Sequence, residues 1–209
     1  MIDKQEIIRF EELIAELFNN AKIRAPIHLS YGNEAQIIEI FKKINIENDW
    51  VCGTWRSHYQ ALLKGIPQDF LTEKIVNGKS MIMNFPQYKF LCSSIVGGIP
   101  SIATGLALSI KRKKSNERVW CWTGDMSAET GSWAEAYKYS LAHDLPITFI
   151  VEDNELSVLT PTKEVWGNNK WYIKNYNESI SWYESKNLIY YRYKNNKYPH
   201  AGAGIRVQF

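Results

Sequence analysis

The chain has 209 residues, of which 45% are hydrophobic and 22% are charged, so it can bury a core and is not expected to be disordered. A formal net charge of +3 is too small to indicate a nucleic-acid partner, and no apolar run is long enough to predict a membrane span. The three cysteines are widely spaced, which excludes a disulfide framework or a zinc site and favours a cytoplasmic location.

Apolar residues recur at helical spacing through the first half of the chain. This pattern predicts helices over residues 3–20, 34–43, 57–65 and 101–113, and a further short helix is expected to open at Pro67. Asp3 is expected to cap the first of them. Residues 77–100 show no such periodicity and predict a long loop, a kind of segment that tends to be functional in compact domains.

The second half alternates strands and helices. Strands are predicted over residues 119–123, 146–151 and 187–193, with a helix over 131–143. Strand, helix and strand at this spacing form a βαβ unit. We therefore predict an α/β fold, a parallel sheet with helices on both faces, in one domain spanning 1–209 whose residues 1–45 form an N-terminal helical extension.

Polar residues follow two of the predicted strands. Asp125 ends the first, and Asn154 ends the second, 29 positions later. Because parallel strands meet at one edge of a sheet, these side chains are expected to lie close together. Their oxygens suit Mg²⁺, and backbone N–H groups after Asp125 can bind phosphate. An ordinary turn with an N-capping Asp125 is the alternative.

Several segments resemble one known family. "GDMSAETGSWAEAYKYSLAHDLPITFIVEDNELSVLTPT" resembles the thiamine-diphosphate motif, written GDG and, after one crossover helix, NN. It is most similar to the alpha subunits of the decarboxylating component of 2-oxoacid dehydrogenase complexes. Other segments resemble further family motifs in the same order, namely "TWRSHYQALLKGI", "GKSMIMNF", "SIVGGIPSIATGLALS" and "NLIYYRYKNNKYPH". The resemblance implies the thiamine-diphosphate-binding fold, with a single diphosphate-binding domain.

The resemblance also implies roles for individual residues. Asp125 and Asn154 would ligate Mg²⁺ through their side chains, and the carbonyl of Leu156 would add a ligand. His58 and His200 are the candidate catalytic residues, and a structural role is the alternative for His58. The remaining residues implied to contact thiamine diphosphate are Trp55, Arg56, Ile95, Val96, Gly124, Met126 and Ser127.

Four positions depart from the family pattern. Met126 replaces the second glycine of GDG, so a positive φ would be difficult there. Asp153 replaces the first Asn of NN, Trp55 replaces a tyrosine, and Ile82 replaces a histidine. These departures weaken the expected site, and the family's helical segment before the last strand is shortened.

The resemblance implies one subunit of a heteromeric enzyme. This subunit would bind the cofactor diphosphate for decarboxylation of a 2-oxoacid and transfer of the acyl or aldehyde unit. A pyrimidine-binding, beta-like subunit would complete the site in an α2β2 assembly. Two alternatives stay open: a transketolase-like subunit acting on sugar phosphates, since "IVEDNEL" resembles a transketolase turn, and a catalytically silent relative kept for assembly or binding.

Overall fold

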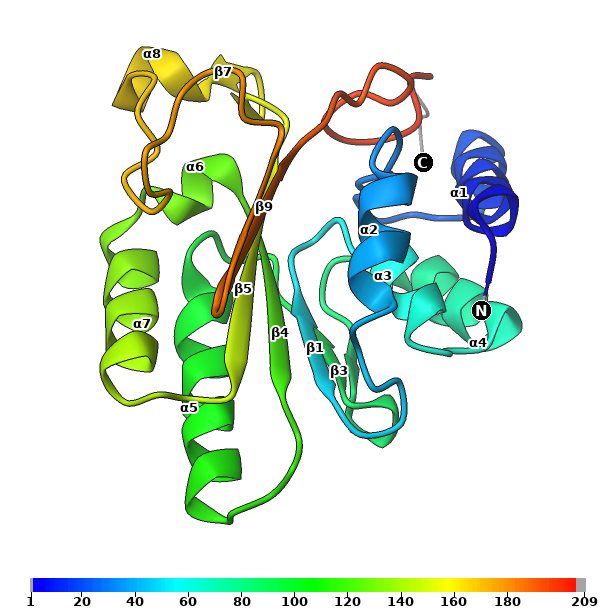
Figure 1. The fold of residues 1–209 in the computed structure, drawn as a ribbon. Coiled ribbons are helices and arrows are strands. Elements are labelled where there is room, and N and C mark those ends of the chain that lie inside the picture. Colours follow the sequence, from blue (N-terminus) through cyan, green and yellow to red (C-terminus); the bar gives the residue numbers. More distant parts are fainter. Residues whose placement is uncertain (1, 206–209) are drawn as a thin grey trace. The chain divides into compact units, whose positions relative to one another are not determined.

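The structure, a computed structural model, describes residues 2–205 (Figure 1). The chain forms two compact units, residues 1–94 with 194–209 and residues 95–193. We call them the first and the second unit and describe each by itself. The single domain that the sequence suggests stays a prediction.

The first unit combines four α-helices with a small sheet. Its helices are α1 (Lys4–Asn19), α2 (Glu34–Phe41), α3 (His58–Leu63) and α4 (Gln68–Lys74). All four helices agree with the sequence prediction. Helix α1 begins at Asp3, whose side chain accepts a hydrogen bond from the N–H of Glu6 while the Glu6 side chain accepts one from the N–H of Asp3. This reciprocal cap confirms the predicted start of the helix.

The sheet of the first unit has three short strands. They are β1 (Trp50–Gly53), β2 (Asn84–Phe85) and β3 (Phe90–Cys92). Strand β3 pairs parallel with β1 and antiparallel with β2. The prediction of one long loop over residues 77–100 is therefore wrong in part, because strands this short show no readable alternation.

The second unit carries the predicted βαβ pattern. Its helices are α5 (Gly98–Arg112), α6 (Asp125–Ala128), α7 (Gly131–Ala142) and α8 (Thr162–Trp166). Its strands are β4 (Val119–Gly124), β5 (Ile147–Asp153), β6 (Leu156–Ser157), β7 (Thr160–Pro161), β8 (Trp182–Ser185) and β9 (Leu188–Arg192). The larger sheet runs β4-β5-β9-β8, where only the last pairing is antiparallel. The α/β class with a mainly parallel sheet is confirmed.

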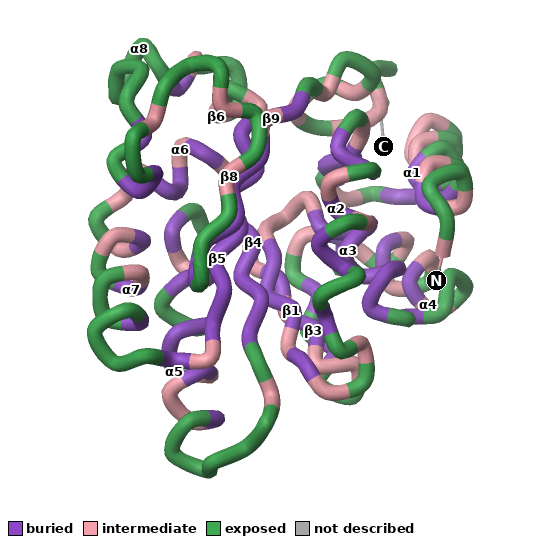
Figure 2. Tube along the Cα trace, viewed as in Figure 1, coloured by how far each residue is buried: buried purple, intermediate pink, exposed green. Residues whose placement is uncertain are grey.

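The core of the second unit lies between this sheet and the helix pair α5 and α7 (Figures 1 and 2). All seven residues of β5 are buried, which is typical of a central parallel strand. Trp133 of α7 packs edge-on against Phe149, with ring centroids 5.5 Å apart, and its indole N–H donates to Thr123 at 3.1 Å. This packing holds the carboxyl ends of β4 and β5 at a fixed edge.

Two further sequence predictions concern absences. Within residues 2–205, none of the helices has the length and apolarity needed to cross a membrane. All three cysteines are free and buried, so no disulfide joins them.

Candidate cofactor and cation site

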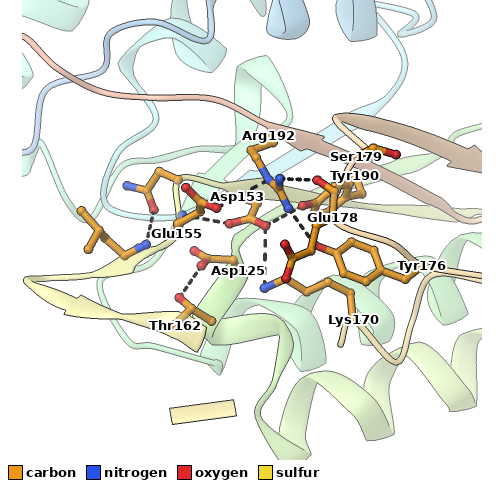
Figure 3. Close-up of polar contacts among 12 residues, drawn as sticks. Asp125, Asp153, Glu155, Thr162, Lys170, Tyr176, Glu178, Ser179, Tyr190 and Arg192 are labelled. Atoms are coloured by element: carbon orange, nitrogen blue, oxygen red, sulfur yellow. Dashed lines mark hydrogen bonds and ion pairs between the residues drawn. The ribbon is translucent and has the colours of Figure 1, made fainter. Parts of the chain in front are cut away.

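The parallel pairing of β4 and β5 brings two carboxyl groups to one edge of the sheet. Gly124 pairs with Glu152, so Asp125 and Asp153 follow at adjacent strand ends. Each of the two aspartates is only 1% exposed, and their side chains share a hydrogen bond. We call Asp125 and Asp153 the acidic pair (Figure 3).

Three side chains from later segments hold the acidic pair (Figure 3). The Thr162 hydroxyl at the start of α8 donates to Oδ2 of Asp125. The Tyr190 hydroxyl on β9 donates to Oδ2 of Asp153 at 2.5 Å, and the Lys170 ammonium lies 3.7 Å from the same oxygen. The pair is therefore buried with two hydroxyl donors and one cation.

Burial and the nearby like charge raise the pKa of Asp125 in the acidic pair. Burial, followed by the neighbouring Asp153 charge, raises the pKa of Asp125 to about 7. Thr162 and Lys170 act in the opposite direction. Burial also raises the pKa of Glu129, one turn after Asp125. Lys170 and Arg192, whose charge also interacts with Asp153, are the cations beside these acidic groups. A divalent cation would further stabilise the ionised carboxylates.

Asn154 and Leu156, the other predicted metal ligands, form a turn directly after β5. The half-buried side chain of Asn154 accepts a hydrogen bond from the N–H of Leu156 at 3.3 Å. Asp153 accepts one from the N–H of Glu155 at 2.8 Å, and Glu155 has a φ of 64°. The turn keeps one lone pair of the Asn154 oxygen available, as a cation ligand requires.

The oxygen atoms at this edge are of the types that bind a hard divalent cation. Carboxylate, amide and carbonyl oxygens are the ligands that Mg²⁺ takes, usually with waters and phosphate oxygens. Residues 2–205 contain no cluster of three acidic, His or Cys side chains suited to a metal. A cation would therefore depend on Asp125, Asn154 and the Leu156 carbonyl, as the resemblance implies, with ligand phosphate.

Met126 does not strain the backbone. It lies inside α6 and is absent from the described residues with positive φ. Its sulfur accepts a hydrogen bond from the indole N–H of Trp166 at 3.1 Å. A helical residue tolerates a side chain, so Met126 fits this position without the positive φ that would favour glycine. Gly124 has a φ of −78°, and a Cβ atom added to it would meet no other atom within 4 Å.

Ser127, Ile95 and Val96 also belong to the second unit. Ser127 is 7% exposed, whereas Ile95 and Val96 are 71% and 53% exposed. The two apolar side chains precede Gly97, whose φ of 71° places it in the left-handed region at the start of α5. Exposed apolar side chains at such a turn are available to an apolar ligand or a partner chain.

The first unit contains the remaining predicted residues. Arg56 donates through Nη2 to the carbonyl of His200 at 3.3 Å, and its buried Nε has no partner. The ring of Trp55 lies 6.3 Å from that of His200. His28, which sequence reasoning missed, donates from Nδ1 to the same carbonyl at 2.6 Å. We call His28, Arg56 and His200 the basic cluster.

Positive charge in the basic cluster is not compensated. Burial, together with the charges of Arg56 and His200, lowers the pKa of His28 to about 4, although the hydrogen bond to the His200 carbonyl acts in the opposite direction. Burial and Arg56 also lower the pKa of His200. Among the described residues, no carboxylate forms an ion pair with Arg56. The cluster is suited chemically to an anion.

His58 occupies a closed environment. It is 0% exposed, and its two ring nitrogens contact Oε2 of Glu11 and Oγ of Ser80, each at 2.8 Å. Its partners come from α1 and from the segment after α4. This geometry favours the structural alternative for His58, whereas its predicted catalytic role stays a prediction.

The profile of the family described as "Dehydrogenase E1 component" matches residues 3–174 of this chain. The chain therefore belongs to the dehydrogenase E1 component family.

Its relatives include alpha subunits of two named enzymes. A pyruvate dehydrogenase E1 component subunit alpha from Porphyra purpurea is 29% identical, over 71% of this chain and 48% of the relative. The one from Rickettsia prowazekii is 28% identical, over 73% and 49%. The alpha subunit of acetoin:2,6-dichlorophenolindophenol oxidoreductase from Bacillus subtilis is 26% identical, over 75% and 50%.

The chain spans about half the length of the curated relatives that it matches. A solved structure from Mycobacterium smegmatis, provisionally described as a thiamin diphosphate-dependent enzyme, is 18% identical over 61% of this chain and 23% of its own. Its TM-score of 0.42 is too low to support an argument about this fold. The family assignment therefore depends on the sequence match.

Proposed function

We propose that this chain is the diphosphate-binding subunit of a thiamine-diphosphate-dependent enzyme that decarboxylates a 2-oxoacid. The acyl or aldehyde unit would then pass to an acceptor. The observation that carries the proposal is the acidic pair at the adjacent ends of β4 and β5, inside a chain of the E1 family. A buried carboxylate at this edge is where a cation bridging to a diphosphate would be needed.

Residues of this chain would bind and orient the cofactor. Asp125, Asn154 and the carbonyl of Leu156 would hold Mg²⁺, and the N–H groups of Met126 and Ser127 would face the diphosphate. Bound thiamine diphosphate supplies carbanion chemistry, whereas the protein supplies position and electrostatics. The backbone around Ile95 and Val96 would meet the aminopyrimidine ring, as the resemblance implies.

The resemblance assigns Arg56 and His200 of the basic cluster to the same cofactor. Arg56 carries a buried, unpartnered Nε, and a guanidinium pairs well with phosphate oxygens. His200 would lie beside that anion as a neutral imidazole, because its pKa is lowered by burial and by Arg56. The assignment of Trp55 to the cofactor site rests on the resemblance; its ring lies 5.8 Å from that of His28 and 6.3 Å from that of His200.

A second chain belongs to the proposal. The resemblance implies a beta-like subunit that binds the pyrimidine ring, in an α2β2 assembly. The names of the relatives, which are alpha subunits, support a heteromeric enzyme. Free, buried cysteines support a reducing compartment such as the cytoplasm.

Calorimetry on the chain together with its partner subunit tests the cofactor assignment. Wild type should bind thiamine diphosphate only when Mg²⁺ is present, and Asp125→Ala should lose this binding. Asp69→Ala, a change at an exposed position of α4, is the control. Equal binding by wild type and Asp125→Ala would contradict the proposal, and no binding by wild type would support the silent alternative.

Turnover assays then separate the two enzyme classes. The family match favours a 2-oxoacid over a sugar phosphate as the substrate class. The assembled enzyme should release CO₂ from 2-oxoacids such as pyruvate and leave sugar phosphates unchanged. Ketol transfer between sugar phosphates, without decarboxylation, would support the transketolase-like alternative instead.

A further inference from the structure

Lys170 is a buried cation in a segment that has no regular secondary structure. It follows α8 and is only 6% exposed, while residues 167–169 before it are exposed. Burying an ammonium group is unfavourable unless opposite charge compensates for it. The surroundings of Lys170 must therefore supply that negative charge.

The negative charge comes from the acidic pair and its neighbour. The Lys170 Nζ lies 3.7 Å from Oδ2 of Asp153, and Figure 3 shows the ammonium turned toward that carboxylate. The charge of Lys170 also acts on Asp125 and on Glu129. One ammonium thus interacts with three acidic groups. They lie near the carboxyl ends of β4 and β5, where a divalent cation is expected.

The Lys170 side chain can move without breaking a helix or strand, because it lies in an irregular stretch, while the residues after it stay anchored by the contact of Tyr172 with Trp133 at 5.2 Å. Lys170 and Ile173 are joined by a turn, in which the N–H of Ile173 donates to the carbonyl of Lys170 at 2.9 Å. Gly167, with a φ of 73°, ends α8 and separates it from this segment. A flexible four-carbon stem also lets a lysine withdraw its charge from a site.

We propose that Lys170 is an internal counter-ion that competes with a divalent cation for the acidic pair Asp125 and Asp153. Without the metal, Lys170 compensates the buried carboxylates. When the metal binds, its charge takes over that role and the ammonium moves outward. This inference rests on the proposed function, because the cation in question is the one that a bound diphosphate would share.

Divalent-cation binding to the full chain, without thiamine diphosphate, tests the inference. Mn²⁺ is the probe, and the free ion is measured by electron paramagnetic resonance. Lys170→Met, which keeps the chain length and removes the charge, should bind Mn²⁺ at least about tenfold more tightly than wild type. Lys174→Met changes an exposed lysine of the same segment and should bind like wild type.

A double variant shows where the gained ion binds. Adding Asp125→Ala to Lys170→Met should remove the gain. Mg²⁺ should also raise the melting temperature of Lys170→Met more than that of wild type, as mass action requires. If Lys170→Met does not fold, Lys170→Gln removes the charge and keeps a hydrogen-bond donor.

Equal or weaker Mn²⁺ binding by the uncharged Lys170 variants overturns the inference, and so does a gain that survives Asp125→Ala. This failure is distinct from a failure of the proposed function. Wild type that still binds thiamine diphosphate with Mg²⁺ through Asp125 would leave the proposed function intact. Only the competing role of Lys170 would then be lost.

Discussion

The acidic pair of the second unit is buried with a cation beside it, whereas the basic cluster of the first unit combines the buried His28 with the half-buried Arg56 and His200. Lys170 lies beside Asp125 and Asp153, whereas no carboxylate pairs with Arg56 among the described residues. The protein thus has a negative site that Lys170 compensates in part and, at Arg56, a positive charge without a carboxylate partner among the described residues. The comparison indicates that each region has chemistry suited to a ligand of opposite charge, a cation at the acidic pair and an anion at the basic cluster.

The two regions should respond to pH in opposite directions, and Asp125 should give the larger effect. Its pKa rises from 3.8 to about 7 on folding, so the native state holds the proton more tightly. Stability is then fully present below pH 3.8 and is lost as the pH rises through about 7. The whole loss is on the order of 4 kcal/mol, of which about 2–3 kcal/mol falls between pH 5 and pH 8, since one unit corresponds to about 1.4 kcal/mol.

Asp125→Asn should remove most of this loss. Urea unfolding at pH 5 and pH 8, without divalent ions, measures it as a smaller difference between the two free energies of unfolding. Asp69→Asn, at an exposed position, should keep the wild-type difference. An unchanged difference in Asp125→Asn would show that the acidic pair does not control the pH dependence.

His28→Gln should reduce the stability that the protein loses at acidic pH, which is the opposite pH dependence to that of Asp125. The pKa of His28 falls from 6.5 to about 4 on folding, so its contribution is present above pH 6.5 and is lost as the pH falls through about 4. The variant should lose less stability than wild type between pH 7 and pH 4, by about 2–3 kcal/mol. Unfolding by urea at both pH values measures this, with His143→Gln, at an exposed helix end, as the control. If His28→Gln lost as much stability as wild type between pH 7 and pH 4, burial of His28 would not be a cause of the acid sensitivity.

Arg56→Ala tests whether the basic cluster contributes to the affinity for thiamine diphosphate. Loss of a charge-assisted contact to a phosphate costs about 1.5–3 kcal/mol, which corresponds to about 10- to 100-fold weaker binding of thiamine diphosphate. Arg56→Lys should restore only part of the affinity, because an ammonium cannot bind two oxygens in one plane. Calorimetry on the assembled enzyme measures both, and Arg24→Ala, at an exposed position, is the control. Wild-type affinity in Arg56→Ala would remove the first unit from the cofactor site.

Thr162→Val should give the smallest effect. The variant keeps the side-chain shape and removes the hydroxyl that donates to Asp125. It should lower the free energy of unfolding by about 1 kcal/mol at pH 8, where Asp125 is ionised, and by less at pH 5. Urea unfolding at both pH values checks the difference, and an equal effect at both would contradict the assigned bond to the carboxylate.

Sequence reasoning succeeded where a residue follows a long, regular element. The apolar runs of β4 and β5 fix two strand ends, so Asp125 could be placed at the edge of a parallel sheet. The cap at Asp3 and helix α7 follow from similarly local signals. Their physical basis is periodicity, which short segments lack.

The rest of the candidate site depends on tertiary contacts that no local pattern encodes. Thr162, Lys170 and His28 come from segments without periodicity. Tertiary folding alone brings the first two to the acidic pair and the third to the basic cluster. Met126 illustrates another limit: the family pattern suggested a positive φ, but the residue lies in a helical turn. Burial of Lys170 beside the acidic pair could be recognised only from the fold.

The central claim is that Asp125, at the end of β4, holds the cation of a bound thiamine diphosphate. Crystals of the chain with its partner subunit, grown with Mn²⁺ and thiamine diphosphate, allow a direct test by anomalous scattering. The account predicts one Mn²⁺ peak about 2–2.5 Å from a carboxylate oxygen of Asp125 and in contact with the diphosphate. A bound diphosphate whose Mn²⁺ lies elsewhere, away from Asp125, would contradict it.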